Sequence, residues 1–346
     1  MRTIEWNEKD KALVLIDQTI LPTEFRTLNY TNYQDVAQAI QTMVVRGAPA
    51  IGVAAAFGMA LAGLQSKAAG LDDLKADLSA AAEHLNAARP TAVNLTWATE
   101  RLLKLGRDYS GNADDLRAAL LAEAQKMADE DVETNMAIAR NGAELIKDGD
   151  TIVHHCNTGA LATVDYGTAL GVIRMAHEQG KKIHVFVDET RPRLQGARLT
   201  AWELSQYGIP YDIIVDSASG YLMRRRMVDI VLFGADRVAS NGDVVNKIGS
   251  YMLALGAYDN GIPAYSVFPL STVDYTMASG EKIEIEERNP EEVLNLQFDG
   301  KPVAPKDASA KNFAFDVTPH RLLSGLITER GVLYPPFFRN LAVLRH

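Results

Sequence analysis

Two patterns of apolar positions divide the chain. Apolar runs typical of short strands lie at residues 3–6 and 12–17. Apolar residues then recur at helical spacing, which predicts helices at residues 33–45, 51–64, 72–87, 94–105 and 113–146. The segment 51–64 is apolar on nearly every face, so its helix should be buried. We therefore expect a helix-rich N-terminal domain of mixed α/β structure with a small sheet, at residues 1–125.

Beyond residue 150, short apolar runs alternate with helical segments. Strands are expected at residues 151–155, 183–187, 211–215, 229–233 and 264–268, with a late one at 327–332. Helices are expected between them, at residues 167–178, 195–207, 220–225 and 244–257. Such alternation predicts βαβ units and a mostly parallel sheet covered on both faces. The second domain, residues 126–346, is therefore of the α/β class, and the long helix at 113–146 links the two domains.

Composition narrows the class of protein. Hydrophobic residues make up 47% of the chain and the net charge is −9, which argues against a nucleic-acid binder with a basic face. We expect no membrane segment, because no run approaches the about 18 apolar residues that a span requires. The N-terminus has no secretory pattern, and a single cysteine allows no internal disulfide. These features predict a cytoplasmic protein.

Several common cofactor motifs are missing from the sequence. No GxGxxG follows a predicted strand, no GxxxxGK[ST] loop is present, and no HExxH occurs. A dehydrogenase or a P-loop NTPase therefore has little support. Nothing in the sequence requires a bound metal or an organic cofactor, and we expect neither.

The only cysteine, Cys156, follows the first strand of the predicted parallel sheet. Ligands of such sheets lie outside the carboxyl ends of the strands. The segment Asn157-Thr158-Gly159 is expected to open a helix, whose positive end would favour a thiolate. An apolar surrounding would have the opposite effect. Cys156 is therefore either a buried, inert side chain or a group that transfers protons or attacks a substrate.

Asp236 follows the fourth strand, in the segment Gly-Ala-Asp-Arg. It could cap a helix, or it could act as a buried carboxylate opposite a thiol, which is a plausible acid/base pair. The histidines before the cysteine, His154 and His155, alternate on the strand, so one should face the core. We assign no role to either histidine.

Several cationic and amide side chains are candidates for binding an anion. Arg46, Gly47 and Ala48 lie between two predicted helices, where they form either a plain turn or, with free N–H groups, a phosphate site. The same two readings apply to Arg89. A salt-bridged loop is the alternative for Arg191 and Arg193. The amide of Gln195 could cap a helix, and Asn246 and Lys247 could lie on a solvated helix face.

Longer motifs resemble the methylthioribose-1-phosphate isomerases of methionine salvage. The matching segments are RGAPAIG (46–52), HCNTGALAT (155–163), DETRPRLQGARLTAWEL (188–204), GADRVASNGDVVNKIGSY (234–251) and ITERGV (327–332). The wider family includes ribose-1,5-bisphosphate isomerases and regulatory subunits of the translation initiation guanine-nucleotide exchange factor. Residues 334–346 match nothing in this pattern.

The resemblance implies more than the residues alone. It implies a Rossmann-like second domain, a homodimer, and a phosphorylated small sugar as substrate. It implies Cys156 and Asp236 as the catalytic pair. Its substrate contacts are Arg46, Gly47, Ala48, Arg89, Gln195, Asn246 and Lys247. The implied reaction converts 5-methylthioribose 1-phosphate to 5-methylthioribulose 1-phosphate. Isomerisation of 5-deoxyribose 1-phosphate or ribose 1,5-bisphosphate, or a non-catalytic regulatory role, is the alternative.

Overall fold

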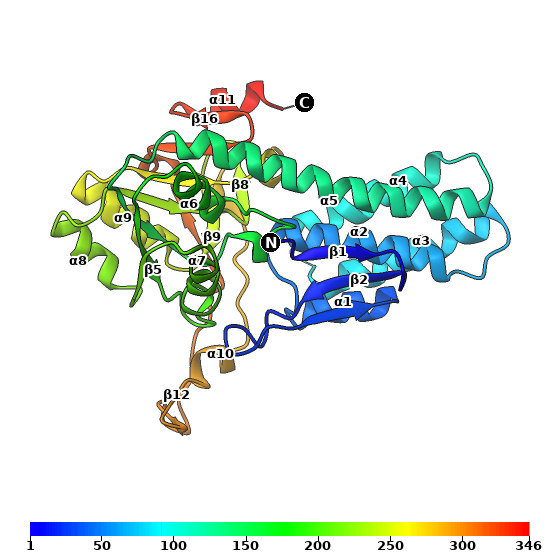
Figure 1. Ribbon diagram of the computed structural model, residues 1–346, viewed down its shortest axis with the longest axis horizontal. Helices are drawn as coiled ribbons and strands as arrows, with labels where there is room; N and C mark the ends of the chain where they lie inside the picture. The colour runs from blue at the N-terminus through cyan, green and yellow to red at the C-terminus, as the bar shows by residue number, and fades with distance from the viewer. Residues whose placement is uncertain (91, 346) are drawn as a thin grey trace. The chain divides into compact units, whose positions relative to one another are not determined.

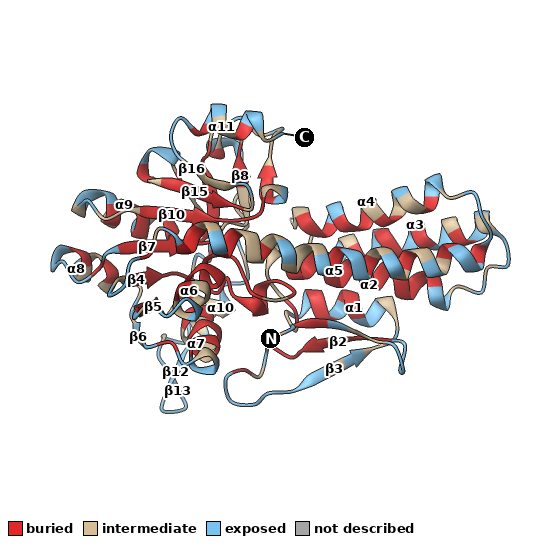
Figure 2. Ribbon diagram, turned by 45° about the horizontal axis from the view of Figure 1, so that its top comes forward, coloured by how far each residue is buried: buried red, intermediate tan, exposed pale blue. Residues whose placement is uncertain are grey.

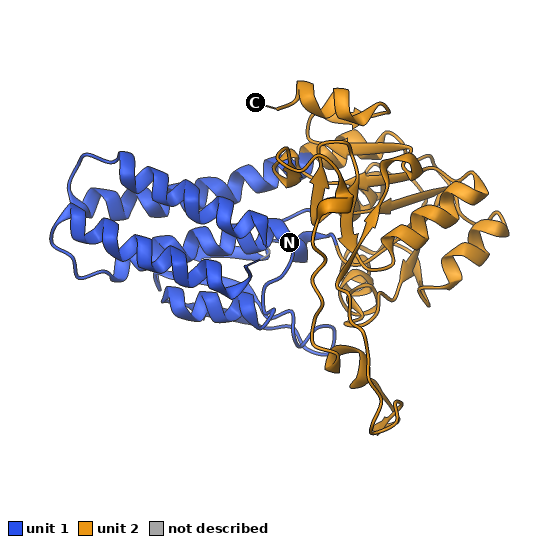
Figure 3. Cartoon of the chain, turned by 180° about the vertical axis from the view of Figure 1, so that it is seen from behind, with its two compact units in different colours: residues 1–136, 158–167 blue, residues 137–157, 168–346 orange. Residues whose placement is uncertain are grey.

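The computed structural model describes residues 1–90 and 92–345, which form two compact units (Figure 3). Unit 1 comprises residues 1–136 and 158–167, and unit 2 comprises residues 137–157 and 168–346. The chain therefore changes unit within its longest helix, α5 (Ala113–Ala143), and again directly after Asn157. The division into domains at residues 125/126 stays a prediction.

Unit 1 is built from helices and one small antiparallel sheet, as the periodicity predicts (Figure 1). Its sheet has the order β1 (Ile4–Asn7), β2 (Ala12–Ile16), β3 (Thr27–Tyr30). The third strand was not predicted, because its alternating exposed and half-buried residues include only two apolar side chains. The helices are α1 (Tyr33–Gln41), α2 (Ala48–Gln65), α3 (Leu71–Ala88), α4 (Val93–Asp108) and the first part of α5.

Helix α2 is the centre of the unit 1 core. It packs against α1, α3 and α4, and Figure 2 shows it largely buried. Of the described helices it is the one whose length and composition would suffice to cross a membrane, but 78% of that stretch is buried inside the protein. The apolar pattern on every face of residues 51–64 therefore reflects burial on all sides, as predicted.

Unit 2 contains the predicted mostly parallel sheet. Its order is β16 (Gly331–Leu333), β15 (Gly325–Thr328), β10 (Ala264–Val267), β7 (Ile230–Phe233), β4 (Thr151–His154), β5 (His184–Asp188), β6 (Tyr211–Ile214). Only β16 runs antiparallel to its neighbour. Every residue of β7, β10 and β15 is buried, which accounts for their continuous apolar runs (Figure 2). The predicted late strand at 327–332 is in fact the hairpin of β15 and β16.

The connecting helices of unit 2 follow the prediction with one exception. They are α6 (Ala169–Glu178), a π-helical turn (Gly196–Thr200) continued by α7 (Ala201–Tyr207), α8 (Ala218–Arg224) and α9 (Ser250–Asn260). The helix predicted at 244–257 is wrong in its first part. Residues Val244–Lys247 form the strand β9, which pairs with two other strands, and α9 begins only after Gly249.

Strand β9 belongs to a second sheet of unit 2. This sheet has the order β11 (Val273–Asp274), β8 (Arg237–Ala239), β9, β14 (Phe315–Thr318). The stretch between β10 and β14 holds only short elements, among them α10 (Glu291–Leu294) and the exposed hairpin of β12 (Gln297–Phe298) and β13 (Lys301–Pro302). The segment that matched no motif carries a final helix, α11 (Phe337–Val343), whose Phe337 and Leu341 are buried.

Candidate active site

The two proposed catalytic residues follow neighbouring parallel strands. The chain passes from β4 to β5 and β6 on one side, and then crosses back to β7 on the other side of β4. Because ligands of open α/β sheets bind where the strand order reverses, the carboxyl ends of β4 and β7 mark the expected crevice. His154 on β4 and Leu232 on β7 are paired residues. Cys156 lies shortly beyond His154 in the chain, and Asp236 lies shortly beyond Leu232.

Cys156 is held in an unusual backbone conformation. Its φ is +66°, and its side chain is buried, with 7% of the residue exposed. Its N–H donates to Thr190 Oγ1 at 2.9 Å, and its carbonyl oxygen accepts from Thr200 Oγ1 at 2.7 Å. A left-handed conformation is unfavourable for a non-glycine residue and is retained where the surroundings determine it, as these two threonines do.

The expected helix directly after Cys156 is not present. The nearest following turn is the three-residue 3₁₀ segment Ala160–Ala162, and α6 begins only at Ala169. The reason is that residues 158–167 leave the sheet and pack in unit 1, where the Val164 carbonyl accepts from the N–H of Thr3. The prediction that the N-terminus of a helix directly after Cys156 favours the thiolate is therefore wrong.

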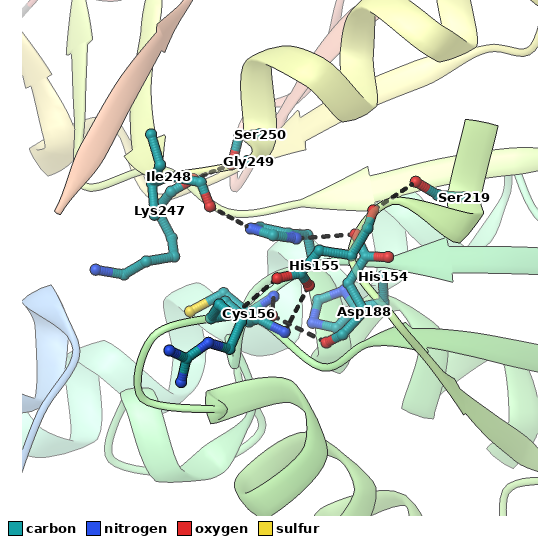
Figure 4. A network of polar contacts seen from close by, with 12 residues as sticks. His154, His155, Cys156, Asp188, Ser219, Lys247, Ile248, Gly249 and Ser250 are labelled. Carbon is teal, nitrogen blue, oxygen red and sulfur yellow. Dashed lines mark hydrogen bonds and ion pairs between the residues drawn. The ribbon is translucent and has the colours of Figure 1, made fainter. Parts of the chain in front are cut away.

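Lys247 connects the proposed pair electrostatically. It lies on β9 with 6% of its surface exposed, and its Nζ donates to the Ala314 carbonyl at 2.8 Å. Burial and the positive charge of Arg288 lower the pKa of Lys247, while the charges of Cys156 and Asp236 act in the opposite direction. Figure 4 shows the thiol of Cys156 and the ammonium of Lys247 extending to the same side of His155. A buried cation is thus within electrostatic reach of both proposed catalytic groups.

The two amides predicted to bind substrate are also buried. Asn246 precedes Lys247 on β9, with 4% of its surface exposed, and its Nδ2 donates to Ser250 Oγ at 2.8 Å. The alternative of a solvated helix face for Asn246 and Lys247 is therefore wrong. Gln195 lies just before the π-helical turn, and its buried Oε1 has no hydrogen-bond partner. An unpaired buried carbonyl oxygen is costly, so it is well suited to accept a hydrogen bond from a ligand hydroxyl.

The remaining predicted contacts lie in unit 1. Gly47 is the N-cap of α2, and Arg46 and Ala48 flank it. Its φ is +97°, and a Cβ at this position would lie 2.4 Å from the Ala162 carbonyl oxygen, so only glycine fits. It does not cap the preceding helix α1, which ends at Gln41. Arg89 is half-buried and forms the C-cap of α3.

Two of the four arginines considered for an anion are engaged in the loop after β5. Arg193 Nη1 lies 3.0 Å from Glu292 Oε1. Arg191 donates from its guanidinium to the carbonyl oxygens of Pro192 and Val293. The alternative of a salt-bridged loop is confirmed for Arg193. Because Arg191 and Arg193 already hold partners within the protein, they support an anion site less than the sequence suggests.

The two histidines, to which the sequence assigns no role, are both buried. His154 Nδ1 lies 3.0 Å from the Leu232 carbonyl oxygen, and burial lowers the pKa of His154 to about 3, so it is neutral. His155 Nδ1 lies 2.9 Å from Asp188 Oδ2, and its Nε2 lies 2.9 Å from the Ile248 carbonyl oxygen (Figure 4). Burial alone would lower the pKa of His155, but the hydrogen bond and charge of Asp188 raise it.

His155, Asp188 and Asp216 form the one group among residues 1–90 and 92–345 whose ligand atoms lie close enough to hold a metal, within 4.8 Å of one another. Both ring nitrogens of His155 already face acceptor oxygens. The Asp216 carboxylate accepts from the N–H groups of Thr190 and Arg191. Asp188 Oδ1 is buried without a hydrogen-bond partner, but the other donor atoms of the group already hold partners, so the set fits a metal ion poorly.

The whole chain is similar to proteins of known name. Residues 44–335 match the Initiation factor 2 subunit family. The chain is 54% identical over 343 residues to methylthioribose-1-phosphate isomerase 2 of Pseudothermotoga lettingae, covering 99% of this chain and 98% of the relative. It is 55% identical over 329 residues to the methylthioribose-1-phosphate isomerase of a Synechococcus species, covering 95% and 94%.

Solved structures agree with this grouping. The 5-methylthioribose 1-phosphate isomerase of Pyrococcus horikoshii OT3 aligns with a TM-score of 0.92 at 47% identity, covering 99% of this chain and 95% of that one. The translation initiation factor eIF-2B subunit delta of A. fulgidus aligns with a TM-score of 0.87 at 44% identity, covering 97% of each. This chain belongs to the Initiation factor 2 subunit family, and within it to the methylthioribose-1-phosphate isomerases.

Proposed function

We propose that the chain is an aldose-ketose isomerase that converts 5-methylthioribose 1-phosphate to 5-methylthioribulose 1-phosphate, using Cys156 and Asp236. The observation that carries the proposal is their position after β4 and β7, at the reversal of strand order, with the charges of both acting on the buried Lys247. The names of the most similar relatives supply the substrate. We further propose that the enzyme is a cytoplasmic homodimer that works in methionine salvage.

The chemistry explains why such a pair is needed. In an aldose 1-phosphate the anomeric oxygen carries the phosphate, so simple ring opening gives no free aldehyde. The bond from C1 to the ring oxygen must break while hydrogen moves from C2 to C1. The C2 hydroxyl also loses its proton as the ketone forms, and the ring oxygen gains one. The overall change is an internal redistribution of hydrogen, which requires neither an oxidant nor a reductant.

We propose that Asp236 handles the protons of the ring oxygen and the C2 hydroxyl. Cys156 would carry the proton from C2 to C1 through an enolate-type intermediate. The rival route is a direct hydride shift, with Cys156 polarising the substrate. A site closed to water suits both routes, because it protects an unstable intermediate. Solvent deuterium found at C1 of the product would exclude a purely direct shift.

The proposal also includes substrate contacts. We propose that Arg46, Gly47, Ala48 and Arg89 contact the substrate, as do the buried side chains of Gln195, Asn246 and Lys247. The unpaired Oε1 of Gln195 supports its role as an acceptor for a sugar hydroxyl. The N–H groups at the start of α2, next to Arg46, support the binding of a phosphate there.

The first experiment tests the pair. Cys156→Ala and Asp236→Asn should each lower kcat by about 100-fold or more if the two groups perform acid/base catalysis. Circular dichroism should show both variants folded, so that the loss reports chemistry. A folded variant with turnover close to that of the unaltered enzyme would remove that residue from the mechanism.

A second experiment tests the substrate. The values of kcat/KM should be compared for 5-methylthioribose 1-phosphate, 5-deoxyribose 1-phosphate and ribose 1,5-bisphosphate. An apolar pocket separates small substituents by only about 1–3 kcal/mol, so the first two sugars should differ modestly. A preference for the bisphosphate would replace the proposed substrate.

A non-catalytic role is the second candidate, because a protein named as an initiation factor subunit is 44% identical to this chain. A scaffold has no need of a thiol and a carboxylate at the strand ends, which favours the enzyme. Turnover by the purified protein decides between the two. The absence of turnover with all three sugars would favour the regulatory role.

A further inference from the structure

His155 follows strand β4, and its ring contacts the segments at the ends of two other strands. It directly precedes Cys156 after β4. Its Nδ1 faces Asp188, the last residue of β5, and its Nε2 faces the carbonyl oxygen of Ile248, which follows Lys247 after β9. Figure 4 shows the ring lying between these two elements. One buried side chain therefore joins the segments that carry the proposed thiol and the buried cation.

The geometry sets the number of protons on this ring. A carbonyl oxygen can only accept, so Nε2 must carry a hydrogen to bind Ile248. The contact of 2.9 Å between Nδ1 and the Asp188 carboxylate requires a second proton between them. Burial raises the pKa of Asp188, but the hydrogen bond and charge of Asp188 also raise the pKa of His155 against the effect of burial. Because an imidazole is ordinarily the more basic of the two groups, we assign the second proton to the ring. His155 is thus an imidazolium paired with the Asp188 carboxylate.

The charged groups around the ring favour the same state. The carboxylate of Asp216 lies near Asp188 and binds two backbone N–H groups. The carboxylate of Asp316, on β14, accepts from the N–H groups of Gly249 and Tyr251 and interacts with the charge on His155. The adjacent His154 is neutral and adds no opposing charge. Two further acidic groups therefore face the cation.

A chain of hydrogen bonds runs from this ion pair to the cysteine backbone. The carbonyl oxygen of Asp188 accepts from Thr190 Oγ1 at 2.9 Å, and Thr190 Oγ1 in turn accepts the N–H of Cys156. On the other side the ring packs against Gly249, where a Cβ would lie 2.8 Å from His155 Cε1. Movement of the ring would therefore displace both the Cys156 backbone and the turn after Lys247.

We propose that His155, held as an imidazolium by Asp188 and the Ile248 carbonyl, is a positioning residue that fixes Cys156 relative to the turn that follows Lys247. This inference rests on the proposed isomerase function of the same site. His155 does not touch the reacting atoms in this assignment. Its effect on the reaction arises from placing the thiol, and a small misplacement of a reacting group can cost about 100-fold in rate.

The kinetic test compares the two adjacent buried histidines. His155→Gln should lower kcat by about 10- to 100-fold while KM changes less than about threefold, because only the transition state requires the thiol in place. The matched control is His154→Gln, which removes an equally buried ring bound to Leu232 on β7. The control should lose stability but keep kcat within about threefold of the unaltered enzyme.

Asp188→Asn extends the test to the partner. An amide cannot hold the imidazolium by charge, so this variant should reproduce the kcat loss of His155→Gln. The kcat of the double variant should be no lower than that of either single variant, because each single substitution already breaks the His155–Asp188 pair. Additive losses, or a kcat for His155→Gln equal to that of the His154→Gln control, would overturn the proposal.

The protonation state can be measured without turnover. In protein labelled with ¹⁵N at histidine, His155 should show two protonated ring nitrogens at pH 8, where an ordinary histidine is neutral. Its signals are assigned by their loss in His155→Gln or, if that variant folds poorly, by their shift in Asp188→Asn. A neutral ring would overturn the inference even in an active enzyme. A lack of turnover together with an imidazolium would instead overturn only the proposed function.

Discussion

Replacing Gly249 by alanine should lower the free energy of unfolding by more than the unfavourable backbone angle alone explains. Gly249 has φ +104°, and its N–H binds Asp316 Oδ2 at 2.7 Å. A new Cβ would lie 2.8 Å from Cε1 and 3.1 Å from Nε2 of the His155 ring. The ring cannot yield easily, because each of its nitrogens holds a partner at 2.9 Å. The substitution thus combines backbone strain with overpacking.

The matched control is Gly149→Ala. Gly149 has φ +92°, its N–H is also bound, to the Lys182 carbonyl at 2.8 Å, and nothing lies within 4 Å of a Cβ placed there. It carries only the conformational cost of a left-handed residue, about 1–2 kcal/mol. Overpacking a rigid site adds about 1–3 kcal/mol. We therefore expect Gly149→Ala to lose about 1–2 kcal/mol and Gly249→Ala about 2–5 kcal/mol of unfolding free energy.

Urea unfolding of both variants, followed by circular dichroism, measures this difference directly. The kinetic consequence should separate them further, because only Gly249→Ala pushes on the ring that holds the Cys156 backbone in place. Its kcat should fall, while that of Gly149→Ala should not. Equal losses of stability together with equal kcat values would refute the account of His155 as a tightly held ring.

Two further predictions concern pH. The pKa of His154 is lowered to about 3 in the folded protein, whereas its ordinary value is 6.5. Below pH 6.5 the unfolded chain therefore binds a proton at His154 that the folded protein does not. Urea unfolding should show that this residue makes the protein about 2 kcal/mol less stable at pH 5 than at pH 8. The pKa of Asp131 is raised to about 7 by burial, so its charge destabilises the fold as pH rises. The melting temperature of Asp131→Asn relative to that of the unaltered protein should therefore rise between pH 5 and pH 9. A difference in melting temperature that stays constant with pH would show that the charge of Asp131 does not destabilise the fold.

Much of the fold could be predicted from the sequence because local periodicity and burial agree. The helix α2 and the strands β4, β7 and β10 combine apolar runs with clear boundaries, and each was predicted within a few residues. The failure at residues 244–257 has a physical cause. The run Val244–Lys247 has only four residues, two apolar and two polar, which is too short to show a strand or a helical period. Its pairing with β8 and β14, which lie elsewhere in the sequence, decides that it is a strand.

The candidate site was predicted less completely than the fold. The segments after β4 and β7 are candidates from the sequence alone, because ligands bind at the carboxyl ends of parallel strands and both segments consist of small, polar or charged residues. The role of His155 could not be found, because alternation along a strand gives the direction of a side chain but not its partners. Asp188 and Ile248 lie far from it in the sequence, and only the folded chain brings them to the two ring nitrogens.

The positive φ at Cys156 has a consequence for the evolution of the enzyme. A residue without a side chain would occupy this conformation more readily, and replacement by glycine at such a position removes an unfavourable contact between Cβ and the backbone. By backbone conformation alone glycine would be the more favourable residue here, and under the proposed function Cys156→Gly would remove the catalytic thiol. A cysteine at this φ carries an unfavourable backbone conformation, and the proposed function accounts for it, because the reaction would require the thiol at this position.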